Sequence, residues 1–133
     1  MFTEFSAAAR AVFTLAEQEC RNASHYYLGT EHLLLAMAIA PPPDVADYFR
    51  SAGIEAWQVK RALRNTLDQP SERNWEGIIV TPRVQRITAM ACEGKKQALV
   101  QPIDVLNAIL ADGGGVAARV WRSLLPQTAD RRL

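Results

Sequence analysis

The chain has 133 residues, 49% of them hydrophobic and 22% charged, which suits one compact domain with a buried core. Its 15 lysines and arginines nearly balance its 14 acidic residues, so no global field predicts a nucleic-acid or anionic-membrane partner. The longest apolar run, 33–43, is far shorter than the roughly 20 residues of a membrane span. Cys20 and Cys92 lack CxxC spacing, which favours buried, reduced thiols in a soluble cytoplasmic protein with no metal site.

Apolar residues recur at three- and four-residue spacing through most of the chain, which predicts an all-α fold. Ser6 is a candidate N-cap for a first helix that ends near Arg21. Thr30 is expected to cap a second helix, 31–39, which is apolar on nearly every face. A helix of that kind belongs in the centre of a bundle.

Two shorter helices complete the first half. A proline triplet stops the second helix, and the third opens at Pro43 or Asp44 and ends before Gly53. A fourth helix follows from Glu55. The segment 69–79 then combines proline, glycine, serine and asparagine with charges, which is typical of a linker.

The helical pattern restarts after the linker. Thr81 stands directly before Pro82, which predicts a capped helix start with proline at the first helical position. A second proline start, at Pro102, opens the next helix. A glycine triplet ends that helix before a last apolar stretch, 116–125.

This restart is an internal repeat. One shift along the chain places 28–38, LGTEHLLLAMA, on 100–110, VQPIDVLNAIL. The same shift places 49–51 on 121–123, and a shift three residues longer pairs the starts of the first helices, Phe5-Ser6 with Val80-Thr81. The second copy has therefore lost three residues in its first loop.

We therefore expect a single domain, 1–133, built as two pseudo-symmetric four-helix repeats. Repeat one covers about 2–68 and repeat two about 80–126. Because the chain stops at Leu133, the last helix of the second repeat is expected to be short or missing.

Three segments together resemble the N-terminal domain of the ClpC-type Clp (Hsp100) unfoldases: MFTEFSAAARAVFTLAEQE, HYYLGTEHLLL and the VTPR restart. The likeness covers about 5–125. It implies a non-enzymatic, cofactor-free, pseudo-twofold domain that binds client proteins or peptides and adaptors for an unfoldase and its protease. It also implies two more specific ligands, arginine-phosphorylated proteins and cyclic-peptide antibiotics such as cyclomarin.

The chain departs from that family pattern in three ways. No GxxxxGK[ST] motif occurs, so the ATPase modules of the family are absent from this sequence. The second motif has Ile103 at the position equivalent to Glu31. Val80 stands where the family commonly has phenylalanine, although Phe2 is retained.

The resemblance assigns a phosphoarginine site to Glu31, Thr30, Ser6 and Thr81. Glu31 would accept hydrogen bonds from the guanidinium, while a hydroxyl such as Ser6 and the N–H groups of an adjacent helix start would receive the phosphate. The alternative is that Thr30 and Glu31 only stabilise their own helix start. Asp104 points about 100° away from the Ile103 position, so we expect it not to replace the missing acid.

A second candidate site is an apolar peptide groove formed by Phe2, Phe5 and Val80. The alternative is that Phe5 and Val80 staple the helices that follow them. His25 and His32 lack further ligands at metal spacing, which favours packing or hydrogen bonding over a metal site.

Two function classes follow from the sequence. The eroded second motif favours a free-standing paralogue that acts as an adaptor or as a decoy for ligands of the unfoldase. The alternative is the excised receptor module of a full-length AAA+ unfoldase.

Overall fold

The structure is a computed structural model that describes residues 5–25, 27–67, 78–93, 95 and 98–125. In this part of the chain it has seven helices: α1 Ala7–Asn22, α2 Thr30–Ile39, α3 Pro43–Ala52, α4 Ala56–Thr66, α5 Pro82–Glu93, α6 Pro102–Asp112 and α7 Gly115–Leu124. Two two-residue strands, β1 Tyr27–Leu28 and β2 Ile79–Val80, are the only strands within it. The all-α prediction is confirmed.

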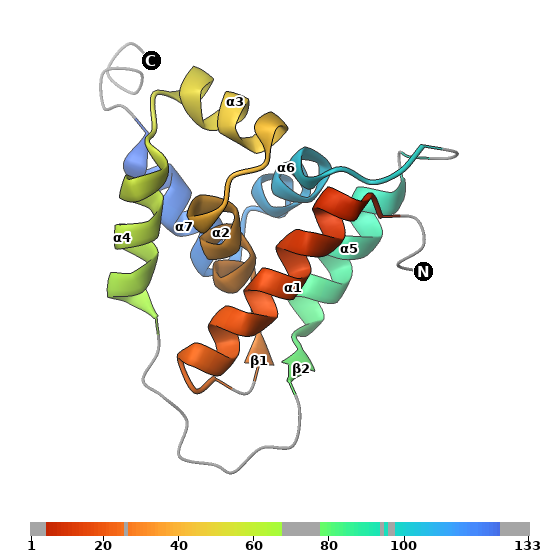
Figure 1. Ribbon diagram of the computed structural model, residues 1–133, viewed down its shortest axis with the longest axis horizontal. Helices are drawn as coiled ribbons and strands as arrows, with labels where there is room; N and C mark the ends of the chain where they lie inside the picture. Colours follow the sequence, from red (N-terminus) through yellow and green to blue (C-terminus); the bar gives the residue numbers. More distant parts are fainter. Residues whose placement is uncertain (1–4, 26, 68–77, 94, 96–97, 126–133) are drawn as a thin grey trace.

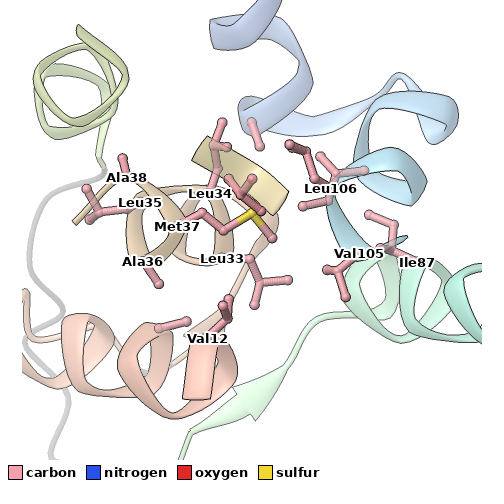
Figure 2. Close-up of a cluster of buried hydrophobic side chains, with 14 of the residues drawn as sticks. Val12, Leu33, Leu34, Leu35, Ala36, Met37, Ala38, Ile87, Val105 and Leu106 are labelled. Carbon is pink, nitrogen blue, oxygen red and sulfur yellow. The ribbon is translucent and has the colours of Figure 1, made fainter. Parts of the chain in front are cut away.

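The helix α2 lies in the middle of the molecule, as its apolar sequence predicts (Figure 1). It packs against α1, α4 and α7, and Leu33, Leu34, Leu35 and Met37 have no exposed surface. Figure 2 shows Leu33 and Met37 on the side of α2 that faces Val105 and Leu106 of α6, while Leu35 points away from them. Burial of each leucine stabilises the fold by about 1.5–3 kcal/mol, so α2 contributes strongly to the stability of the core.

Local signals set the helix bounds close to those predicted. Ser6 caps α1 by accepting the Ala9 N–H at 3.0 Å, and Thr81 accepts the Val84 N–H at 3.3 Å. Gly53 ends α3 at φ 75°, a left-handed conformation in which glycine carries no steric penalty. The hydroxyls of Ser6 and Thr81 and the glycine at position 53 therefore act where the sequence predicts.

The repeat is visible in the helix bounds. The shift that aligns the two GTEH-like segments carries α3, Pro43–Ala52, onto α7, Gly115–Leu124, residue for residue. Phe49 and its counterpart Trp121 pack against each other across the two halves, with ring centroids 5.3 Å apart. Four helices precede and three follow the predicted linker, most of which, like 126–133, lies outside the described residues.

No helix in the described part is both long and apolar enough to cross a membrane.

Candidate functional site

The two repeats exchange contacts at their helix starts. The strands β1 and β2 pair in parallel, with Leu28 opposite Val80, and Thr81 N donates to Leu28 O at 3.1 Å. The equivalent contact joins Phe5 to Val100, where Ser6 N donates to Val100 O at 2.9 Å. The first helix of each repeat therefore begins beside the second helix of the other repeat.

This exchange corrects the predicted partner of Glu31. The helix start next to α2 is that of α5, with Thr81, and not that of α1, with Ser6. Ser6 lies instead at the second copy of the motif, beside Val100. The described residues thus form a first site, α2 with α5, and a second site, α6 with α1.

The prediction that Thr30 caps α2 is wrong. Gly29 is the N-cap of α2, while Thr30 is the first helical residue and is only 2% exposed. His32 completes the cap, because its Nδ1 accepts the Gly29 N–H at 3.0 Å. A buried histidine at the third helical position does here what glutamate does in the usual capping box.

The two histidines form a buried hydrogen-bonded chain. Since Nδ1 of His32 accepts from Gly29, its Nε2 carries the hydrogen and donates to His25 Nδ1 at 2.8 Å. His25 and His32 are 1% and 0% exposed. The prediction of hydrogen-bonding histidines is confirmed, and no group of three metal-binding side chains occurs among the described residues.

Glu31 lies partly exposed at the start of α2. Its carboxylate folds over Gly29, so close that a Cβ on Gly29 would come within 2.5 Å of Glu31 Oε1. Burial, followed by the negative charge of Glu31, raises the pKa of the Cys20 thiol to about 12. Because His32 makes the cap, the carboxylate of Glu31 is not required for it.

The positively charged side chain of Arg83 lies beside this first site. Arg83 of α5 donates to Asp112 at 2.5 Å, and Arg86 donates to the same carboxylate at 3.1 Å. Burial alone would raise the pKa of Asp112, but the hydrogen bonds from Arg83 and Arg86 lower it below its usual value. A Cβ on Gly115 would meet both Arg83 Cδ, at 2.8 Å, and Thr30 Oγ1, at 3.2 Å, so the guanidinium arm lies close to the start of α2.

The second site has different chemistry. Asp104 takes the capping role of His32 by accepting the Gln101 N–H at 2.8 Å, and it forms an ion pair with Lys95 at 3.2 Å. Asp104 is thus the counterpart of His32 in capping, and both its contacts lie within the second repeat. A carboxylate from the other repeat is also present, because Asp44 of α3 accepts the N–H of Ile103 at 3.1 Å.

Of the residues predicted to form the apolar groove, the structure places Phe5 in the core and Val80 at the surface. Phe5 is 1% exposed and packs edge-on against Phe13 at 5.5 Å, so it belongs to the core. Val80 is 38% exposed and follows Ile79, which is 59% exposed. Phe2 lies outside the described residues.

Three features of the site were not predicted from the sequence: the partner of Arg83, the pairing of Asp44 with α6 and the capping by His32. Arg83 follows a recognised helix-start signal, but its partner Asp112 is remote in the chain. Asp44 is likewise remote in the chain from Ile103 of α6, whose N–H it accepts. Capping by His32 had a local signal, namely a polar side chain three residues after Gly29. The equivalent spacing from Gln101 to Asp104 supports the same interpretation.

Comparison with known sequences identifies the family. The family model of the Clp repeat (R) N-terminal domain matches residues 4–124. The chloroplastic chaperone protein ClpC1 of Oryza sativa subsp. japonica is 30% identical over 127 residues, which are 93% of this chain and 14% of that protein. The negative regulator of genetic competence ClpC/MecB of Bacillus subtilis is 25% identical over 93% of this chain and 16% of its own length. The chain thus spans about one seventh of these relatives.

Solved structures share the fold. The N-terminal domain of ClpD from Arabidopsis thaliana has a TM-score of 0.72 at 20% identity, covering 93% of this chain and 89% of that one. The N-domain of ClpV from Vibrio cholerae has a TM-score of 0.71 at 21% identity, covering 84% and 69%. A ClpV N-domain in complex with a VipB peptide scores 0.66 at 22% identity, covering 83% and 69%. Because the family model matches residues 4–124, nearly the whole length, the chain belongs to the Clp repeat N-terminal domain family.

Proposed function

We propose that this domain is a non-catalytic receptor for protein or peptide segments, and that its first site binds phosphoarginine. The observation that carries the proposal is the exchange of helix starts, which brings Thr81 and the start of α5 beside the helix that carries Glu31. The solved complex of a ClpV N-domain, which shares the fold, with a VipB peptide supports the receptor role.

The first site suits phosphoarginine, whose side chain carries both a positive guanidinium and a negative phosphate. A carboxylate binds a guanidinium through charge-assisted hydrogen bonds, and Glu31 supplies one that its own helix cap does not need. The N–H groups at a helix start favour a phosphate, and the start of α5 adds the arginine side chain of Arg83 nearby. The second site has Ile103 in place of the acid, so we expect one phosphoarginine per domain.

Calorimetry with a peptide containing one phosphoarginine tests this proposal. The wild-type chain should bind with a stoichiometry near one, and Glu31→Gln should weaken binding at least tenfold, about 1.4 kcal/mol. Glu17→Gln removes an equal charge from the exposed face of α1 and should change nothing. The unmodified arginine peptide should not compete at this site.

The Glu31→Gln variant should keep its melting temperature, since His32 holds the cap, so a loss of binding would report on recognition and not on folding. Equal affinity of wild type and Glu31→Gln, or no binding to the wild type, would exclude the phosphoarginine site.

The role of the domain in a Clp system is a further part of the proposal. We infer that it acts as an adaptor or as a decoy for a ClpC-type unfoldase; as part of a longer unfoldase, it would be that protein's own receptor. Adding the isolated domain to a degradation assay with a ClpC-type unfoldase, its protease and an arginine-phosphorylated client separates an adaptor from a decoy. An adaptor accelerates degradation, whereas a decoy slows it because the client stays bound to the isolated domain.

Binding of cyclomarin-like cyclic peptides is a second candidate, favoured by the exposed apolar pair Ile79 and Val80 at the start of α5. Val80→Phe would enlarge this surface and should tighten binding of such a peptide, while Phe2→Ala should weaken it. Unchanged titrations for both variants would exclude a peptide site at this position.

A further inference from the structure

A continuous groove runs along the outer face of α1 and ends at the second site. One hollow of about 240 Å³ lies between α1 and the end of α2, and one of about 470 Å³ lies between α1, the start of α3 and the start of α6. The two share Ala8, Pro42 and Pro43, so they form one groove.

The walls of this groove are small and apolar. Ala8, Ala11 and Leu15 recur along α1 at helical spacing and span about 10 Å, at 1.5 Å per residue. Ala8 and Ala11 are exposed and border the face of α1 that is buried in the core, since Val12 belongs both to that face and to the groove. The groove therefore has room for the apolar side chains of about two helical turns of a partner segment.

Asp44 is the single charged side chain among the described residues that line the groove. Its Oδ1 accepts the N–H of Val45 at 2.7 Å and its Oδ2 accepts the N–H of Ile103 at 3.1 Å. These hydrogen bonds hold the Asp44 carboxylate in place where it lines the groove. Each carboxylate oxygen has two lone pairs, so both oxygens can accept a further hydrogen bond.

The position of Asp44 determines which charge the groove accepts. The carboxylate occupies the start of α6, where a phosphate would otherwise be favoured, so an anionic group would meet a like charge there. A guanidinium or ammonium group would meet a fixed, half-buried acceptor in apolar surroundings. The charge preference is thus opposite to that proposed for the phosphate at the first site.

We propose that this groove binds an apolar peptide segment that carries one unmodified arginine or lysine, with Asp44 as the residue that pairs with the basic side chain. The site is separate from the α2–α5 site and does not depend on phosphoarginine recognition. The domain would then have two receptor sites with different ligand chemistry.

Selection from a random 12-residue peptide library on the whole chain tests the proposal, with counter-selection against Ala11→Glu, which places a charged side chain in the groove. The recovered peptides should be apolar and enriched in arginine or lysine. They should bind Asp44→Asn at least tenfold more weakly than wild type, and replacing their basic residue by citrulline or norleucine should have the same effect.

Two control variants make the result specific. Asp47→Asn removes an exposed charge from the same helix and should leave binding unchanged. Glu31→Gln should also leave it unchanged, which separates this site from the proposed phosphoarginine site. If no peptide discriminates against Ala11→Glu, or if the selected peptides lack basic residues or bind a folded Asp44→Asn variant equally well, the proposal is wrong.

Discussion

The ion-pair junction at Asp112 allows a direct test of how the second repeat is held together. Asp112 lies at the end of α6 and accepts hydrogen bonds from Arg83 and Arg86 of α5. Its side chain is 9% exposed, whereas those of the two arginines are 38% and 53% exposed. We expect Asp112→Asn to keep the size of the side chain and remove its charge.

The magnitude follows from these contacts. A hydrogen bond to a charged group contributes about 1.5–3 kcal/mol, and exposure of the arginines reduces this through solvent screening. We expect Asp112→Asn to lower the free energy of unfolding by about 1–3 kcal/mol at pH 7, and the melting temperature by about 4–10 °C.

The lowered pKa of Asp112 determines how its contribution to stability changes with pH. Because the hydrogen bonds from the arginines depress the pKa of Asp112, its contribution to stability is complete above the unfolded value of about 3.9 and is lost as the pH falls through the folded value. Asparagine does not titrate, so the difference in stability between wild type and Asp112→Asn should shrink below about pH 4.

Urea unfolding followed by circular dichroism at pH 7 and at pH 3 measures both effects. Asp47→Asn is the matched control, because Asp47 pairs with Arg50 at 2.7 Å while both side chains are more than 70% exposed, and such pairs contribute about 0–1 kcal/mol. If the two variants lost equal stability at pH 7, or if the loss in Asp112→Asn increased on acidification, the explanation would be refuted.

Three more predictions concern residues close to the first site. His32→Ala should destabilise the fold by about 2–4 kcal/mol, because both Gly29 N–H and His25 Nδ1 lose a buried partner, and thermal unfolding will show it. Gly115→Ala should cost about 1–2 kcal/mol, since φ is 83° and the new Cβ would meet Arg83, and it should cost more than Gly113→Ala, which meets no atom closer than 3.9 Å. Cys20, fully buried and with a raised pKa, should stay unlabelled by a thiol reagent at pH 8 until urea unfolds the chain, whereas labelling in the native state would contradict its burial.

Much of the fold could be predicted because its signals are local. Proline at the first helical position marks α5 and α6, and glycine marks the ends of α3 and α6. The apolar sequence of α2 predicts its central position, because a helix without a polar face must be covered on all sides. These features depend on residues a few positions apart.

The partners within the site could not be predicted in the same way. The internal repeat establishes that Ser6 corresponds to Thr81, but correspondence between two copies does not say which copy lies beside Glu31. That depends on the exchange of helix starts across the two repeats, which is a property of the packed structure. The pairing of Arg83 with Asp112 also depends on how the helices pack, since 29 residues separate the two in the chain.

The structure also separates two roles that the GTEH motif combines. Capping is carried out by the third helical residue, His32 in one copy and Asp104 in the other, and both accept the N–H of their N-cap residue. The second helical residue, Glu31 or Ile103, can therefore change without loss of the helix start. A carboxylate at that position is worth only about 0.3–1 kcal/mol to its helix. A functional role for Glu31 consequently does not compete with capping, so its substitution should affect binding without loss of the helix start.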